Sequence, residues 1–177
     1  MQRAVFLDRD GTVINAIERP ELDKKLTAPF ALSEVAFVPL LEDAIRIFRK
    51  LGYLVIMITN QPDVAYELLS ESEWGKINET VINKVRPDDC FMCRHRREDH
   101  CPMKKPSPMM IIAAADKWNV NLVESFMIGD TENDVLAGKK AGCRTILIHK
   151  NYNINVVGAD FVVSSLYKAA LLVAAAK

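Results

Sequence analysis

The sequence of 177 residues has no excess of either charge and no long apolar run. Its 23 basic residues balance 23 acidic ones, so charge gives no reason to expect nonspecific binding to nucleic acid. No apolar stretch reaches the roughly 18 to 20 residues that cross a membrane. No basic leader precedes the first apolar run at residues 3–8, and no internal repeat is visible. We therefore expect a cytoplasmic monomer with neither nucleic acid nor a membrane as partner.

Cysteine is also scarce, and its placement argues against a disulfide framework. Three of the four cysteines fall within twelve residues, with two histidines among them: Cys90, Cys93, Cys101, His95 and His100. In a cytosolic enzyme such crowding favours a metal site over disulfides. Cys143 stands apart, after the glycine that ends a predicted helix, and is expected in the core.

Short apolar segments alternate with amphipathic ones along the chain. Strands are predicted at residues 3–8, 53–58, 89–92, 125–128, 144–148 and 161–163. Helices are predicted at residues 40–51, 70–84, 107–118, 132–141 and 166–176. This alternation predicts an α/β fold: a doubly wound, mostly parallel sheet with helices on both faces. We expect a single domain over residues 1–177, with a Cys/His loop at about 90–105 and no separate cap domain.

Two local features refine this prediction. Residues 9–35 are expected to form a long irregular segment, and loops of that length in a compact domain are usually functional. Ser70 is expected to cap the helix that follows it, with Glu73 as its capping-box partner.

Polar side chains follow three of the predicted strands. They are Asp8 and Asp10, Thr59 with Asn60 and Gln61, and Asp130 with Asp134. The carboxyl ends of parallel strands meet at one edge of a sheet, so these side chains should lie close together. Carboxylates so near one another need a cation, and hard oxygen ligands suit Mg²⁺. With a lysine from the Lys104–Lys105 pair, such a site could stabilise a phosphoryl group in transfer.

The motifs resemble those of the haloacid dehalogenase superfamily of phosphotransferases. Asp8-Arg9-Asp10-Gly11-Thr12 is similar to its first motif, while Thr59, Lys105-Pro106 and residues 129–134 are similar to the second, third and fourth. The resemblance implies that Asp8 is a nucleophile that forms an aspartyl-phosphate. It also implies that Asp10 protonates the leaving oxygen and then activates water.

The same resemblance implies the binding roles. Thr59 and Lys105 would hold the phosphoryl oxygens. The implied ligands of Mg²⁺ are Asp8, Asp130 and the carbonyl of Asp10, with Asp134 outside the ligand set. Arg9, between the two aspartates, could face the substrate or point outward.

Residues 6–15 and 59–65 resemble a smaller, cap-less branch of that superfamily, which removes phosphate from heptose bisphosphates and histidinol phosphate. The branch carries a zinc loop, and its pattern implies three ligands here: Cys93, His95 and Cys101. Met103 stands where the branch has a further cysteine, and a thioether binds zinc poorly. Cys90, spaced from Cys93 as in many zinc sites, is the favoured fourth ligand, and His100 is the other candidate. The alternative is a loop without metal, whose cysteines are small buried hydrophobes.

The resemblance also implies a substrate, D-glycero-D-manno-heptose 1,7-bisphosphate. The residues expected to bind it are Thr59, Asn60, Gln61, Lys104 and Lys105. Lys104 replaces an arginine of the branch and loses its bidentate fork. Tyr66 and Glu67 replace an arginine and a glycine, so the changes concern substrate choice rather than phosphoryl transfer.

Other functions remain open at this stage. Within the class, histidinol phosphate or another sugar phosphate is the alternative substrate. A nucleic-acid end phosphatase is disfavoured by the balanced charge. A non-catalytic phospho-acceptor or binding module would also use acids, Mg²⁺ and a lysine, but Asp10 argues for an enzyme that hydrolyses its own intermediate.

Overall fold

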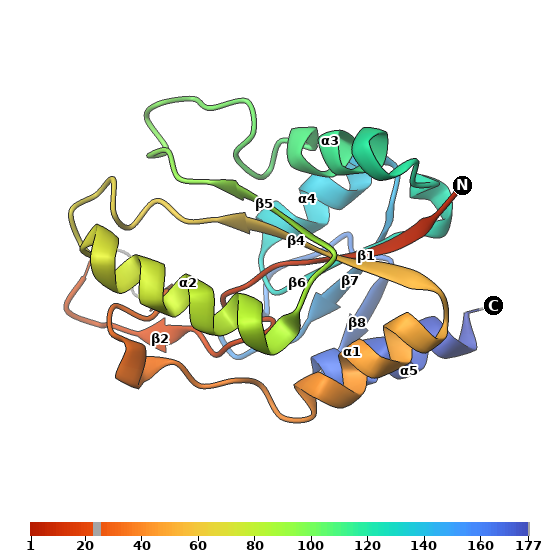
Figure 1. Cartoon of the computed structure of the whole chain (residues 1–177), viewed down its shortest axis with the longest axis horizontal. Helices are drawn as coiled ribbons and strands as arrows, with labels where there is room; N and C mark the ends of the chain where they lie inside the picture. Colours follow the sequence, from red (N-terminus) through yellow and green to blue (C-terminus); the bar gives the residue numbers. More distant parts are fainter. Residues whose placement is uncertain (23–25, 177) are drawn as a thin grey trace.

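A computed structural model of the chain describes residues 1–22 and 26–176, and its centre is one parallel β-sheet (Figure 1). The strands lie in the order β5-β4-β1-β6-β7-β8, and every neighbouring pair is parallel. Their bounds are β1 Arg3–Leu7, β4 Tyr53–Asn60, β5 Asp89–Cys93, β6 Phe126–Gly129, β7 Arg144–Ile148 and β8 Phe161–Val163. The predicted doubly wound α/β fold is confirmed.

The order in which strands are added to the sheet reverses beside β1. The chain runs from β1 outward through β4 to β5, then returns to β6 on the other side of β1. Leu7 is paired with Met57 on one side and with Ile128 on the other. The residues that follow these three therefore emerge at one level, where open parallel sheets form their binding crevice.

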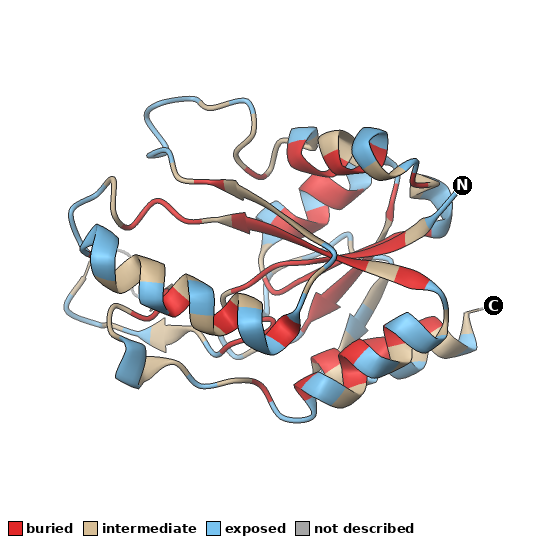
Figure 2. Ribbon diagram, in the orientation of Figure 1, coloured by how far each residue is buried: buried red, intermediate tan, exposed pale blue. Residues whose placement is uncertain are grey.

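Helices cover both faces of the sheet. Their bounds are α1 Leu41–Lys50, α2 Glu71–Val85, α3 Met109–Trp118, α4 Glu132–Ala141 and α5 Leu166–Ala175. Buried residues of α1, α2 and α5 form one core with Val5 and Leu7 of β1, whereas those of α3 and α4 form the other with Ala4 and Phe6. Figure 2 shows the buried faces of the helices turned toward the sheet. Alternate residues of β1 thus serve opposite cores, as the two-residue period of a strand requires.

The segment after β1 has more structure than predicted. A short antiparallel pair, β2 Ile17–Glu18 and β3 Leu26–Thr27, lies within it, followed by a 3₁₀ turn, η1 Leu32–Glu34. Residues 23–25, which belong to the predicted loop, lie outside the described residues. Within residues 1–22 and 26–176, no helix has the length and apolar character needed to cross a bilayer.

One predicted cap differs in detail. The Ser70 hydroxyl accepts a hydrogen bond from the Glu73 N–H, as expected of an N-cap. The Glu73 carboxylate, however, accepts from the N–H of Leu32 at 2.8 Å, so it ties α2 to η1. A reciprocal capping box occurs instead at α4, between Thr131 and Asp134.

Candidate active site

The end of β1 delivers Asp8 to the crevice and then turns the chain sharply. The Asp8 N–H still donates to the carbonyl of Ile128, which anchors the residue to β6. In the next turn the Arg9 carbonyl accepts from the N–H groups of Thr12, Val13 and Ile14. Three hydrogen bonds to one carbonyl hold this turn closed and fix the backbone on both sides of Asp10.

Gly11 is required where that turn meets β6. Its φ is +84°, a region that residues with a side chain rarely adopt. A Cβ at this position would lie 2.0 Å from Oδ2 of Asp130. The absence of a side chain therefore lets the first and fourth motifs approach each other.

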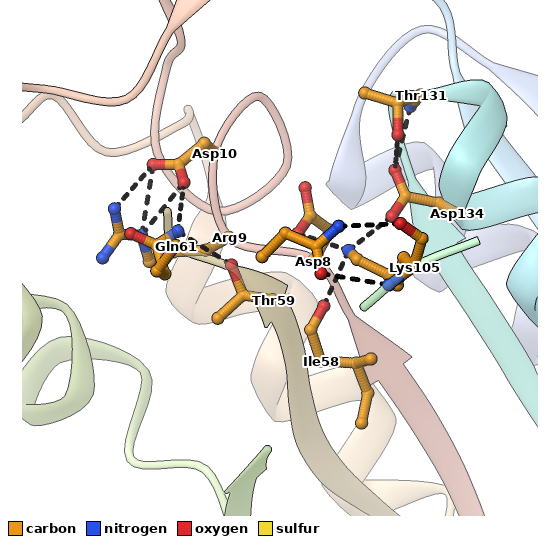
Figure 3. A network of polar contacts seen from close by, with 10 residues as sticks. Asp8, Arg9, Asp10, Ile58, Thr59, Gln61, Lys105, Thr131 and Asp134 are labelled. Carbon is orange, nitrogen blue, oxygen red and sulfur yellow. Dashed lines mark hydrogen bonds and ion pairs between the residues drawn. The ribbon is translucent and has the colours of Figure 1, made fainter. Parts of the chain in front are cut away.

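Lys105 enters the site from the loop after β5 and joins three strand ends (Figure 3). Its ammonium donates to Asp8 Oδ1 at 2.7 Å, to Asp134 Oδ1 at 2.5 Å and to the Ile58 carbonyl at 2.8 Å. Its backbone is held by Asn60, whose side-chain amide exchanges two hydrogen bonds of 3.1 Å with the N–H and C=O of Lys105. All three ammonium hydrogens have acceptors, so the position of Lys105 is fully determined.

Three carboxylates form the acidic part of the site. Oxygens of Asp8, Asp130 and Asp134 lie within 4.8 Å of one another, and all three residues are buried. Asp134 is fully engaged, since its other oxygen accepts from the N–H and hydroxyl of Thr131. Asp130 Oδ2 accepts from the Tyr152 hydroxyl at 2.5 Å, while its Oδ1 is buried and has no hydrogen-bond partner in the described part of the chain.

The crowding of these acids perturbs their pKa values. Burial raises the pKa of Asp8 to about 7, although the Lys105 ammonium opposes the shift. Burial, together with the charges of Asp8 and Asp134, raises the pKa of Asp130 to about 8. Burial alone would lower the pKa of Lys105, but the two carboxylates that it contacts raise it above its usual value. One lysine thus compensates only part of the negative charge that the cluster gathers.

This donor set fits a small divalent cation. The oxygens are hard ligands, and within residues 1–22 and 26–176 the buried Oδ1 of Asp130 has no hydrogen-bond partner. A cation between Asp8 and Asp130 would let both be ionised at neutral pH.

The side chain of Asp10 lies apart from that cluster. Arg9 Nε donates to its two oxygens at 3.1 and 3.2 Å, and Gln61 Nε2 donates to Oδ2 at 2.6 Å. Arg9 is completely buried, so it neither faces solvent nor enters the pocket, the two orientations that the sequence left open. Gln61 is also buried, and the same amide nitrogen donates to the Thr59 hydroxyl at 2.9 Å.

A cavity of about 490 Å³ opens over the strand ends. The predicted site residues on its wall are Asp8, Asp10, Asn60, Lys105 and Asp130. Thr59, Gln61 and Lys104, also predicted to bind substrate, are not among the lining residues. The Lys104 ammonium donates to the His95 carbonyl at 2.8 Å, within the Cys/His loop.

Several residues of the site were not predicted. The wall also contains Thr27, Asp63, Thr131 and Asn133. Tyr152 and Asn153 lie in the loop after β7, where the Asn153 amide donates to the carbonyls of Asp130 and Ile148. Their signal was available, because polar residues after a parallel strand belong to the same sheet edge as those of the first three motifs. His149, at the start of this loop, is exposed.

The Cys/His loop brings together three of its predicted ligands. Cys93, His95 and Cys101 have potential ligand atoms within 4.8 Å of one another, and Cys93 Sγ lies 3.8 Å from Nδ1 of His95. Burial raises the pKa of the Cys93 thiol. Cys143 is buried, as predicted, in the core that also contains Cys93 and the buried residues of α3 and α4.

The favoured fourth ligand, Cys90, lies apart from this cluster. Cys90 packs against the core of α1, α2 and α5, whereas Cys93 belongs to the core of α3 and α4. The two residues are three positions apart on β5, and an odd separation along a strand sends side chains to opposite faces. Burial in this apolar setting raises the pKa of Cys90 to about 11. Among the described residues, His100 does not join the cluster either.

Comparison with known proteins agrees with these features. A family model described as HAD-hydrolase-like matches residues 102–169. A D-glycero-beta-D-manno-heptose-1,7-bisphosphate 7-phosphatase of Helicobacter pylori is 34% identical over 152 residues, which cover 82% of this chain and 83% of the relative. A Pasteurella multocida protein of the same name is 29% identical over 94% of each chain.

A solved structure shares the whole fold. The D,D-heptose 1,7-bisphosphate phosphatase of B. bronchiseptica, complexed with magnesium and phosphate, has a TM-score of 0.83 at 22% identity, over 99% of this chain and 100% of that one. The chain therefore belongs to the haloacid dehalogenase-like hydrolases, and within them to the family of these curated heptose-bisphosphate phosphatases.

Proposed function

We propose that the protein is a Mg²⁺-dependent phosphomonoesterase that works through an aspartyl-phosphate on a small phosphorylated metabolite. One observation carries the proposal: Asp8 lies on the pocket wall with Oδ1 held by Lys105, and a second carboxylate, Asp10, stands two residues further on the same wall. A nucleophile, a fixed cation and a separate acid are the groups that phosphoryl transfer needs.

The cation would be held by Asp8, Asp130 and the carbonyl of Asp10. Bound Mg²⁺ would neutralise negative charge on the transferred phosphoryl group. Asp134 would act through Lys105, because both of its oxygens already accept hydrogen bonds within the protein.

The first chemical step is attack by Asp8 on phosphorus. Lys105 holds Oδ1 of Asp8, so the other oxygen forms the new P–O bond. The bond from phosphorus to the leaving oxygen breaks, and the proton on Asp10 passes to that oxygen. Lys105 also places a positive charge beside the phosphoryl oxygens as their charge grows.

The second step returns the enzyme to its starting state. The Asp10 carboxylate takes a proton from water, whose oxygen attacks phosphorus. The bond between phosphorus and Asp8 breaks, its electron pair returns to the Asp8 carboxylate, and inorganic phosphate leaves. Asp10 is protonated again and ready for the next substrate.

The favoured substrate is D-glycero-D-manno-heptose 1,7-bisphosphate. The names of the curated relatives support this choice, and so does the cavity wall. Thr27, Asp63, Thr131 and Asn133 offer hydroxyl, carboxylate and amide groups to a polyol. The cavity of about 490 Å³ is in the range of small-molecule sites.

Phosphate release from a panel of substrates tests this function. The panel contains heptose 1,7-bisphosphates of both anomers, histidinol phosphate, common sugar phosphates and a 3′-phosphorylated oligonucleotide. We expect Mg²⁺-dependent release that is fastest with a heptose bisphosphate. A preference for histidinol phosphate or the oligonucleotide would replace the substrate, and no release from any compound would favour a phospho-acceptor or binding module.

Variants of the two aspartates test the mechanism. Asp8→Asn should abolish turnover, and Asp10→Asn should slow it strongly and let phosphoenzyme accumulate. Asp116→Asn, the same change at an exposed position on α3, is the matched control. Full activity of purified Asp8→Asn would rule out Asp8 as the nucleophile.

We propose that the Cys/His loop holds a structural zinc ion, which Cys93, His95 and Cys101 would bind. The ion would stabilise the loop that leads into Lys105. Metal analysis of protein purified without chelator should find about one zinc per chain. Cys101→Ser should lose it and Cys90→Ser should keep it; loss of zinc in Cys90→Ser would restore Cys90 as a ligand.

A further inference from the structure

We infer that Arg9 and Gln61 are positioning residues that hold Asp10 in the place from which it moves protons. The inference rests on the proposed phosphatase mechanism, in which Asp10 is the acid and then the base. It gives Gln61 a different role from the substrate binding that its motif implied, and it gives Arg9 a role that the sequence left open.

The contacts of Asp10 divide its surroundings into two sides. One side opens on the cavity, where 17% of the side chain is exposed. The other side is closed by Arg9 Nε, in contact with both oxygens, and by the Gln61 amide at 2.6 Å (Figure 3). The turn of residues 9–14 already fixes the backbone, so rotation of the Asp10 side chain is the remaining freedom, and these two residues restrict it.

A purely structural role does not explain the buried guanidinium of Arg9. Its side chain is 0% exposed, and its Nη1 has no hydrogen-bond partner within residues 1–22 and 26–176. A buried cation with unpaired donors costs stability, and an apolar side chain of similar size would pack at less cost. Asp10 is the carboxylate with which it forms an ion pair, at 3.1 Å. Retaining the guanidinium there makes sense if the position of Asp10 matters for the reaction.

Gln61 connects the same carboxylate to the second motif. Its Nε2 contacts Asp10 Oδ2 and the Thr59 hydroxyl together, and its backbone N–H donates to the Cys93 carbonyl at 2.7 Å. Gln61 as a whole is 1% exposed and is not among the residues that line the cavity. Gln61 therefore reaches the reaction through Asp10 and Thr59 rather than by touching the substrate.

The two steps of the mechanism make a specific demand on Asp10. Loss of an alkoxide from a sugar phosphate needs a proton at the breaking bond, whereas p-nitrophenolate leaves as a stable anion without one. The value of kcat/KM reports only the steps up to departure of the leaving group, so it excludes the later hydrolysis of the phosphoenzyme. A misplaced Asp10 should therefore lower kcat/KM for the sugar phosphate and spare kcat/KM for p-nitrophenyl phosphate.

The experiment compares both substrates in Arg9→Lys and Gln61→Leu. Arg9→Lys keeps the charge but loses the fork, and Gln61→Leu keeps the approximate volume but loses the amide. We expect kcat/KM for the sugar phosphate to fall by about 10- to 100-fold, and that for p-nitrophenyl phosphate by less than about threefold. Arg3→Lys is the matched control, because Arg3 begins β1, at the end of that strand opposite the site.

The outcomes separate this inference from the proposed function. Wild-type turnover of both substrates supports the function whatever the variants do. Equal losses on the two substrates, or no loss on either, would overturn the positioning role while leaving the function intact. Circular dichroism and thermal unfolding check the fold of each variant. If Arg9→Lys does not fold, Gln61→Leu alone decides by the same ratio.

Discussion

The Tyr152 hydroxyl offers a sharp test of the proposed metal site, through the variant Tyr152→Phe. The hydroxyl donates to Oδ2 of Asp130 at 2.5 Å, whereas the buried Oδ1 has no hydrogen-bond partner among the described residues. This hydrogen bond lowers the pKa of Asp130 against the larger effect of burial, which raises it. Removing the hydroxyl should make Asp130 harder to ionise and freer to rotate, so Mg²⁺ should bind more weakly.

The magnitude follows from the type of hydrogen bond that is lost. A hydrogen bond to a charged group contributes about 1.5 to 3 kcal/mol. Tyr152 is 40% exposed, so water can replace part of the contact and the lower value applies. A loss of about 1.4 kcal/mol corresponds to a tenfold change in an equilibrium constant, so we expect about tenfold weaker Mg²⁺ binding.

Titration of the purified protein with Mg²⁺ measures this change by calorimetry, independently of turnover. Phosphate release against Mg²⁺ concentration should show the same displacement, with kcat nearly recovered at saturating Mg²⁺. Tyr53→Phe is the matched control, because Tyr53 begins β4, at the end of that strand away from the site. Unchanged Mg²⁺ affinity in Tyr152→Phe would refute the assignment of Asp130 as a ligand oriented by Tyr152.

Three further predictions concern the same site and the Cys/His loop. Gly11→Ala should lower the free energy of unfolding, measured in urea, by at least about 1 to 2 kcal/mol, because its backbone is left-handed. It should also abolish turnover, because the new Cβ displaces Asp130. A fully active variant would contradict this. The pKa values of Asp8 and Asp130 are raised in the folded state to about 7 and about 8, so the stability that they allow at low pH is lost as pH rises from about 4 to 8. Without metal, the melting temperature should therefore be lowered by this loss of stability at high pH. Mg²⁺ should raise the melting temperature more at about pH 8 than at about pH 5. Equal increases at the two pH values would contradict the raised pKa values. Chelation of zinc or Cys101→Ser should increase proteolysis in residues 94–104 before it affects the rest of the chain, whereas uniform cleavage would argue against a local metal site.

Most of the fold could be predicted because its signals are local. Apolar runs and helical stripes located the six main-sheet strands and the five α-helices that the structure describes in residues 1–22 and 26–176, with errors of a few residues at their ends. Thr59 and Asn60 were placed just after the predicted strand 53–58, yet they pair with Met92 and Cys93 as the last residues of β4. Polar side chains at the end of a buried strand look like a turn in sequence, because their pairing partners are distant in the chain.

The contents of the site were predictable in part. Asp8, Lys105, Asp130 and Asp134 were expected together, since parallel strands bring successive carboxyl ends to one edge, and the structure places them in contact or within 4.8 Å. The roles assigned to them stay predictions that the experiments above address. Tyr152 and Asn153 were missed because no motif marked the loop after β7.

By itself, the sequence determined the α/β fold, the family and the order of chemical groups at the strand ends. These depend on periodicity and on residues that are neighbours in the chain. Only the tertiary structure decided the direction in which each side chain points: Cys90 away from Cys93, Gln61 toward Asp10, and Lys104 into its own loop. The direction of a side chain depends on the face of the strand that bears it and on contacts with residues distant in the sequence. A linear pattern of residues does not contain those contacts.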